Sequence, residues 1–160
     1  MKPMTLPFVA AAAAVALLFS VPAAVQADPA EQIEERQDFM KGLAKELRGI
    51  RNFVQEAEGA PEDVVEAARR IGEKAEEIPS LFPAGTGMHE VELKTGARPE
   101  IWEDPEDFAA KAANLRELAL NFAEEVEKLG DDRTAIGRGL ASLGRDGCGA
   151  CHQVYREDLD

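Results

Sequence analysis

The chain has 160 residues, of which 31 are acidic and 18 are basic, so its formal net charge at pH 7 is −13. This length suits one compact domain with a single core and leaves no room for a second. The strong negative charge makes nucleic acid and anionic lipid surfaces poor partners, because both would repel it.

Residues 1–27 have the features of a signal peptide. Lys2 supplies one positive charge, residues 6–19 form an apolar stretch broken only by Pro7, and Val25 and Ala27 offer small residues at a cleavage site. Cleavage after about Ala27 would leave residues 28–160 as one exported domain. That domain would keep 31 acidic and 17 basic residues, a formal charge of −14.

An uncleaved membrane anchor is the alternative for the same segment. Ser20, Pro22 and Gln26 interrupt the apolar stretch before it is long enough to span a bilayer comfortably. We therefore expect no stable membrane insertion once the signal peptide has been removed.

The first helical pattern begins at Asp28 and Pro29, which provide an N-cap and a first-turn proline, and Gly59 marks its end. Two apolar rows with a seven-residue repeat follow: Ile33, Met40, Leu47 and Val54, and then Leu43, Ile50 and Ala57. Arg36 falls on the second row, so this cation is expected to face the interior and to need a partner. The alternative for Arg36 is a side chain that snorkels to solvent at the helix start.

The second helical pattern begins at Pro61 and stops at Pro79. Its buried stripe consists of Val64, Ala68, Ile71, Ala75 and Ile78. Glycine and proline then mark residues 79–99 as a connection, which is long for a small domain. We expect this connection to wrap the bundle or to contain a short turn of its own.

The third pattern begins at Asp104 and Pro105, which repeat the capping device, and it ends at Gly130. Its apolar positions follow the 3-4 spacing of a helix without a break. They are Phe108, Ala112, Leu115, Ala119, Phe122, Val126 and Leu129.

The fourth pattern begins near Asp131 or Asp132. One side of it holds Ile136, Leu140, Leu143, Gly147, Cys151 and Val154. It also contains five glycines, each of which destabilises a helix interior by about 1 kcal/mol relative to alanine. Close approach of a neighbouring helix or a rigid ring would compensate, because glycine has no Cβ to hold it away. Four such segments predict an all-α fold, an antiparallel four-helix bundle.

Residues 148–152 read Cys-Gly-Ala-Cys-His. On a helix, positions 148, 151 and 152 lie at i, i+3 and i+4, so the two thiols and the imidazole share one face. The motif is typical of covalent attachment of one haem c, with thioether bonds to Cys148 and Cys151 and with His152 as an iron ligand. The haem would then be held between the helices.

Three other interpretations of the cysteines are weaker. A closed zinc site needs four ligands, and only His89 is left as a fourth. A redox dithiol needs its Cys-x-x-Cys at the start of a helix in a βαβ setting, which this all-helical pattern does not provide. A disulfide is disfavoured, because i and i+3 side chains on one helix rarely meet the required dihedral angle.

Met40 is the second candidate iron ligand. It lies four residues after Arg36 on the same helical face, so a ring against this helix could present a propionate to Arg36 and its iron to the Met40 thioether. A core methionine that fills a gap is the alternative for Met40.

The sequence shows no catalytic constellation. Ser142, for example, has no histidine or aspartate at a recognisable spacing. Most glutamates and aspartates fall on the solvated faces of the four helical patterns, where charge is expected. We therefore predict that the chain is not an enzyme.

Three segments resemble the cytochrome c′ family, the class II c-type cytochromes that include the low-spin c-556 subtype. They are residues 36–41, residues 98–102, and the 148–152 motif with Tyr155 and Arg156 behind it. The position of the motif near the C-terminus is specific, because most other c-type cytochromes carry it near the N-terminus. The resemblance spans essentially all of residues 28–160.

The resemblance implies a periplasmic four-helix bundle, often a homodimer, with haem c attached through Cys148 and Cys151. It also implies His152 as the proximal ligand and Arg36 near a propionate. Two roles for position 40 stay open. In c-556-type members a methionine there is the sixth ligand of an electron carrier, whereas five-coordinate members bind NO or CO on an open distal face.

The presence of Met40 favours electron transfer to a redox partner protein. The net negative charge predicts that this partner docks through a basic patch. Ordinary solubility is the alternative explanation of the acidity.

Overall fold

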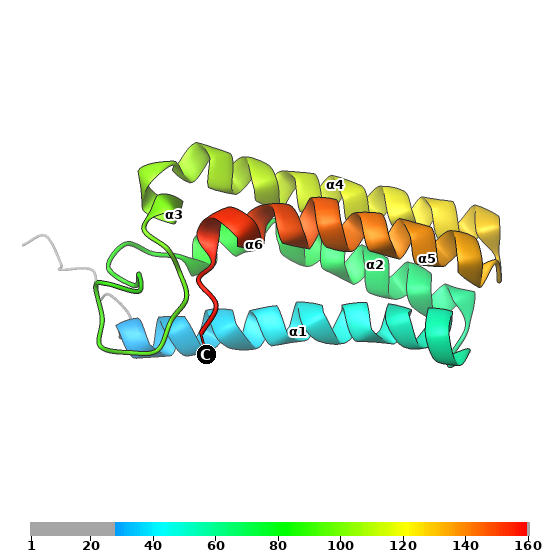
Figure 1. The fold of residues 1–160 in the computed structure, drawn as a ribbon, viewed down its shortest axis with the longest axis horizontal. Helices are drawn as coiled ribbons and strands as arrows, with labels where there is room; N and C mark the ends of the chain where they lie inside the picture. The colour runs from blue at the N-terminus through cyan, green and yellow to red at the C-terminus, as the bar shows by residue number, and fades with distance from the viewer. Residues whose placement is uncertain (1–27, 160) are drawn as a thin grey trace, which may run out of the picture.

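The structure, a computed structural model, describes residues 28–159, so the predicted signal peptide and its cleavage site lie outside the described residues. Within this range the chain forms helices and one isolated β-bridge, without a strand. Four long helical runs pack as an antiparallel bundle, which confirms the predicted fold class (Figure 1). No helix in the described range is both long and apolar enough to cross a membrane.

Helix α1, Pro29–Glu56, begins as expected, because the Asp28 carboxylate accepts a hydrogen bond of 3.0 Å from the Ala30 N–H. Leu43 and Ile50 of the predicted interior row are buried. Ala57 is instead an exposed C-cap with a φ of 59°. The helix therefore ends at a left-handed alanine, before the glycine that was expected to end it.

Helix α2, Pro61–Ala75, buries the predicted stripe, and it packs mainly against α4. Ile78 is buried too, but it belongs to a separate 3-10 turn, η1, Ile78–Leu81. Pro79 has no N–H for a continued α-helix, which accounts for the break. The turn η1 confirms the expectation of a short turn in residues 79–99, and the connection then leads to the four-residue helix α3, Glu100–Glu103.

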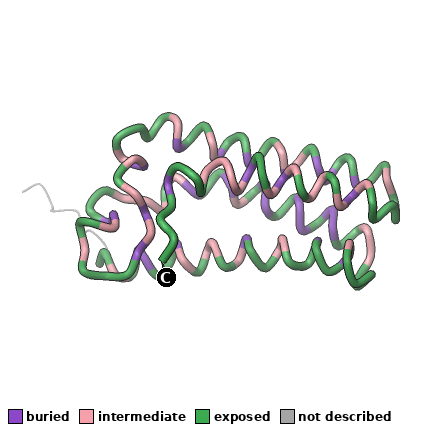
Figure 2. Tube along the Cα trace, viewed as in Figure 1, coloured by how far each residue is buried: buried purple, intermediate pink, exposed green. Residues whose placement is uncertain are grey.

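Helix α4, Pro105–Leu129, follows the sequence pattern closely. The Asp104 carboxylate accepts a hydrogen bond of 3.0 Å from the Asp107 N–H, and Gly130, with a φ of 59°, ends the helix. The predicted stripe is buried from Phe108 to Val126, and Leu129 is half-buried (Figure 2). This helix packs against α2 and against the last helical run of the chain.

The last helical run is not a uniform α-helix. Helix α5, Arg133–Ser142, continues as a π-helical segment, η2, Leu143–Gly149, and then as α6, Ala150–Tyr155. A π-helical turn contains more residues than an α-helical turn, so the buried side shifts along the sequence after η2. The sequence pattern placed Val154 on the same side of the helix as Leu143 and Cys151, but Val154 is 39% exposed, whereas its neighbour Tyr155 is 4% exposed. The α-helical spacing therefore fails after η2.

Two glycines of this run lie where a neighbouring helix approaches closely. A Cβ at Gly139 would lie 2.6 Å from the ring of Phe122, and a Cβ at Gly147 would lie 2.9 Å from Leu115. Both neighbours belong to α4. The expectation of close approach is confirmed at these positions, whereas Gly144 has no neighbouring atom within 4 Å.

The chain beyond α6 runs back across the end of the bundle toward α1 (Figure 1). Ala97 and Arg156 form an antiparallel bridge, the Arg98 N–H donates to the Tyr155 carbonyl at 3.1 Å, and the Glu157 N–H donates to the Gly96 carbonyl at 2.8 Å. These contacts tie the end of the long connection to the segment that follows the Cys-x-x-Cys-His motif.

Candidate haem site

A cavity of about 580 Å³ lies between α1, α4, α6 and the end of the long connection. Its volume falls within the range of cofactor sites in proteins. The side chains of Arg36, Met40, Cys148, Cys151 and His152 all line it. The structure thus brings the five predicted site residues together, although they come from opposite ends of the sequence.

The walls of the cavity are mainly apolar. They include Leu43, Leu47, Ile78, Phe82, Ala97, Ile101, Phe108, Ala112 and Leu115. An apolar surface with a few charged groups suits a flat hydrophobic macrocycle that carries propionates. Most of these residues were predicted as core positions. Their second role as cavity walls was not predicted, because helical periodicity alone does not show where helices separate.

The two cysteines are half-buried and free, Cys148 in η2 and Cys151 in α6. Burial raises the pKa of the Cys151 thiol to about 11, and burial also raises the pKa of Cys148. A redox-active dithiol needs a lowered pKa, since the thiolate is the reactive form. The structure therefore gives no support to the dithiol interpretation.

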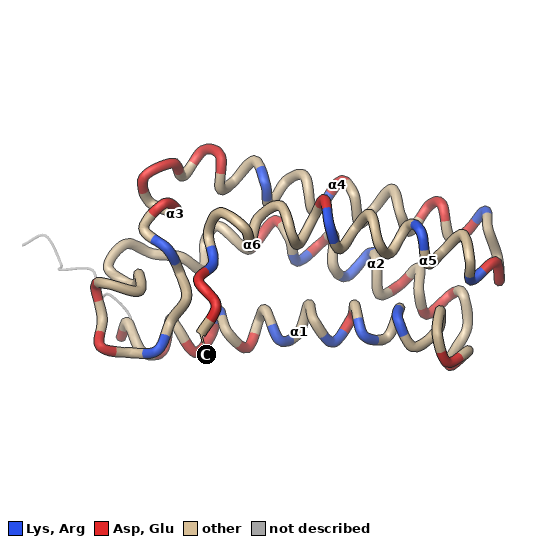
Figure 3. The backbone as a smooth tube through the Cα atoms, viewed as in Figure 1, with Lys and Arg blue, Asp and Glu red and all other residues tan. Residues whose placement is uncertain are grey.

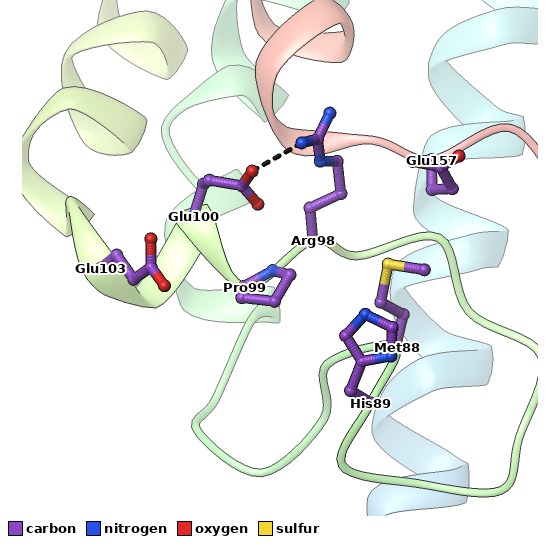
Figure 4. Close-up of a pocket in the computed structure, with 7 residues that line it drawn as sticks. All are labelled: Met88, His89, Arg98, Pro99, Glu100, Glu103 and Glu157. Carbon is purple, nitrogen blue, oxygen red and sulfur yellow. Dashed lines mark hydrogen bonds and ion pairs between the residues drawn. The ribbon is translucent and has the colours of Figure 1, made fainter.

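His89 does not line the cavity that contains the Cys-x-x-Cys-His motif. It lines a separate pocket of about 290 Å³ with Met88, Arg98 and Glu157, as Figure 4 shows. Within residues 28–159, no three His, Cys, Asp or Glu side chains converge closely enough to hold a metal ion. The zinc interpretation, which needed His89 as the fourth ligand, is therefore not supported by the geometry.

His152 lies on α6 and lines the same cavity as the two cysteines. Desolvation of the ring, followed by the positive charge of Arg156, lowers the pKa of His152 below its ordinary value. A lower pKa favours the neutral imidazole, which is the form that can bind a metal through its free nitrogen.

Arg36 is 3% exposed, so the snorkelling alternative is wrong. Its guanidinium donates to the Thr86 hydroxyl at 2.7 Å, to the Thr86 carbonyl at 2.7 Å and to the Thr95 hydroxyl at 2.5 Å. The group also lies 4.9 Å from the centre of the Phe82 ring. The two threonines were not predicted as partners, because they lie in the irregular connection about which periodicity says nothing.

The partners of Arg36 provide hydrogen bonds but no negative charge, since no carboxylate of the described residues pairs with it. Burial accordingly lowers its pKa. A buried cation without a counter-charge is costly. Because Arg36 lines the cavity, an anionic group bound there would compensate this charge, and a haem propionate fits that requirement.

Met40 is half-buried on α1 and packs against the core. It also lines the cavity, one helical turn from Arg36. The α1 side of the cavity thus carries a cation and a thioether, while the α6 side carries the imidazole and one of the two thiols. This arrangement defines a haem-binding helical bundle of the c type.

Comparison with known proteins identifies the family. The family model described as Cytochrome C′ matches residues 31–156. Cytochrome c′ of Rhodospirillum rubrum is 32% identical over 146 residues, which cover 91% of this chain and 95% of the relative. Cytochrome c-556 of Agrobacterium tumefaciens is 34% identical over 128 residues, which cover 79% of this chain and 98% of the relative.

The fold comparison agrees. A crystal structure of a cytochrome c′ with an unusual ligand-controlled dimer dissociation matches with a TM-score of 0.70 and 25% identity, covering 84% of this chain and 100% of that chain. The chain belongs to the cytochrome c′ family, whose members bind haem c covalently. The cavity, the two cysteines near the C-terminus and the uncompensated charge of Arg36 all fit that cofactor.

Proposed function

We propose that the protein is a periplasmic electron carrier with one haem c, bound through six-coordinate ligation by His152 and Met40. The observation that carries this proposal is the presence of Met40 in the same cavity as the Cys-x-x-Cys-His motif. Bound haem c would supply a one-electron couple between ferric and ferrous iron. We propose a carrier rather than an enzyme, because a fixed two-ligand site leaves iron no position for a substrate.

Each residue of the site has a separate role in this proposal. Cys148 and Cys151 would hold the macrocycle by thioether bonds. His152 and Met40 would bind its iron, and Arg36 would pair with a propionate. The apolar walls would limit the access of water to the bound group.

The periplasmic location rests on the signal-peptide features of residues 1–27, with residues 28–160 as the exported domain. We propose a redox partner protein for this domain, and a homodimer as its state of assembly. The name of the solved relative, which mentions dimer dissociation, supports the dimer.

A five-coordinate gas-binding protein is the second candidate. Met40 also packs against the core, so its thioether could remain a packing group and leave the distal face open to NO or CO. The solved relative is described as having a ligand-controlled dimer, which supports this candidate as well.

The optical spectrum of the reduced holoprotein distinguishes the two candidates. Six-coordinate ligation predicts a low-spin ferrous spectrum at neutral pH that is lost in Met40→Ala. Met88→Ala is the matched control, because Met88 is also half-buried but lines the other pocket, and it should leave the spectrum unchanged. A high-spin spectrum with rapid, tight CO uptake by the native protein would favour the gas-binding candidate.

The covalent link is tested separately by mass spectrometry of the exported protein. A haem adduct on the peptide that contains Cys148 and Cys151 is expected. A colourless protein without that adduct, made alongside a working maturation system, would contradict both candidates.

A further inference from the structure

The middle of α1 carries a local charge opposite in sign to that of the whole chain. Residues 38–55 contain four basic and two acidic residues, in a protein with a net charge of −13. Figure 3 shows basic residues gathered along the middle of α1, with acidic residues toward both of its ends. The four basic residues are Lys41, Lys45, Arg48 and Arg51, which we call the α1 basic surface.

The two acidic residues of this segment are already paired. Asp38 forms an ion pair of 2.7 Å with Lys41, and Glu46 forms one of 2.9 Å with Arg70 of α2. The side chains of Lys45, Arg48 and Arg51 are exposed and form no hydrogen bond or ion pair with any residue in the described range. Three cations on one helix therefore keep their full charge at the surface.

These three cations border the haem cavity. Lys41, Ala44 and Leu47 line the cavity from α1, and Lys45, Arg48 and Arg51 each follow one of them by four residues. Residues at i and i+4 are neighbours on a helix, with Cβ atoms about 5–6 Å apart. The α1 basic surface thus continues the α1 edge of the cavity by one turn.

The other borders of the cavity are also basic. Its charged lining consists of Arg36, Lys41, Lys94, Lys111, Arg156 and the single acid Glu157. Lys111 and Arg156 face Asp107 and Asp158, each at 3.5 Å, so their charges are partly balanced. The charges that remain unbalanced by a neighbour are therefore concentrated on α1.

We propose that the α1 basic surface docks an acidic redox protein at the haem cavity. The inference rests on the electron-transfer function proposed above. At physiological ionic strength the Debye length is about 8 Å, much shorter than α1, which is about 40 Å long. A partner at the cavity is therefore attracted by the local positive charge, because the distant acidic residues are screened from it. A partner that approaches another face meets acidic residues at short range and is repelled. We therefore expect an acidic surface on the partner, whereas the net charge of the chain alone predicted a basic patch.

The test uses oxidation of the ferrous holoprotein by the anion hexacyanoferrate(III), followed by stopped-flow absorbance at several ionic strengths. One electron leaves the haem iron, and hexacyanoferrate(III) becomes hexacyanoferrate(II). Local attraction predicts a rate constant that falls as ionic strength rises, despite the net negative charge of the protein. A polyglutamate peptide should compete and slow the reaction at low ionic strength.

The variant Arg48→Glu/Arg51→Glu should lose about tenfold in rate at low ionic strength and reverse the salt dependence. Lys128→Glu/Arg133→Glu is the matched control, since it changes the net charge equally on exposed residues where α4 ends and α5 begins (Figure 1). It should keep most of the native rate. Equal losses in both variants, or a native rate that rises with ionic strength, would overturn the proposal.

Two further measurements distinguish the proposal from alternative explanations. Both variants should keep the native optical spectrum. The spectrum tests the assigned iron ligands separately, so an error in that assignment does not affect the test of docking by salt dependence. Sedimentation of the native protein and of Arg48→Glu/Arg51→Glu tests a second copy as the occupant. Dissociation of a dimer in the variant, without a change in salt dependence, would make the surface a contact between copies and would refute partner docking.

Discussion

The Tyr155 hydroxyl donates a hydrogen bond of 2.6 Å to the carboxylate of Asp107, which joins α6 to the first turn of α4. The Tyr155 ring is buried and packs edge-on against Phe108, with ring centroids 5.0 Å apart. Tyr155 lies three residues after His152, so this contact holds the helical turn that carries the predicted proximal ligand.

Tyr155→Phe should lower the thermal unfolding midpoint of the holoprotein by a few degrees. The substitution keeps the ring packing against Phe108 but removes a hydrogen bond to a charged group, the stronger kind in proteins. Circular dichroism measures the midpoint, and Asp107→Asn serves as the reciprocal control. If Tyr155→Phe unfolds at the native temperature, the contact contributes nothing to the docking of α6.

The same contact predicts a pH dependence of stability. The Tyr155 hydrogen bond, and then the charge of Lys111, hold the pKa of Asp107 below its ordinary value. A lowered folded-state pKa gives stability that is present above the unfolded value, about 3.9, and is lost as pH falls through the folded value. Urea unfolding of native protein and Tyr155→Phe should therefore converge at acidic pH. A difference that stays constant down to full protonation would contradict this origin.

At alkaline pH the folding stability depends on pH in the opposite direction, because Tyr155 titrates there. Burial and the Asp107 carboxylate raise the pKa of Tyr155 above its ordinary value of about 10. A raised folded-state pKa gives stability that is present below the unfolded value and is lost as pH rises through the folded value. The native protein should therefore lose stability above about pH 10 more steeply than Tyr155→Phe does.

The buried charge of Arg36 predicts an effect on the redox potential. Ferric haem carries one more positive charge than ferrous haem, so a nearby buried cation favours the reduced state. Arg36→Met should lower the midpoint potential in a spectroelectrochemical titration. Arg70→Met is the control, because Arg70 is an exposed arginine of α2 that does not line the cavity, and it should leave the potential nearly unchanged. Equal potentials in all three proteins would place the Arg36 charge too far from the haem to matter.

The grouping of the candidate site residues around one cavity could be predicted, because these residues follow regular rules. Met40 and Arg36 lie one turn apart on a long amphipathic helix, and the spacing of Cys148, Cys151 and His152 places them on one side of another. Periodicity and spacing act over a few residues, so the sequence shows them directly.

The features that could not be predicted depend on contacts between distant segments. Thr86 and Thr95 reach Arg36 from an irregular connection, 50 and 59 residues away in the sequence. The π-helical turn before α6 moves burial from Val154 to Tyr155, and no residue pattern announces such a change of helix type. The docking surface proposed on α1 likewise depends on local charge, which the net charge of the chain averages out.

The close approach of Gly96 to the chain after α6 gives the last prediction. The Glu157 carbonyl lies so close to Gly96 that a Cβ at position 96 would collide with it. Because the obstacle is backbone rather than a flexible side chain, Gly96→Ala should separate the two segments. The amide protons of Arg98 and Glu157, which now donate across this pairing, should then exchange with solvent at least tenfold faster. Gly42→Ala is the control, since nothing lies within 4 Å of a Cβ there, and it should leave these amides protected. Unchanged protection in Gly96→Ala would mean that the segments can shift apart without breaking their hydrogen bonds, so the glycine would not be needed to close this side of the cavity.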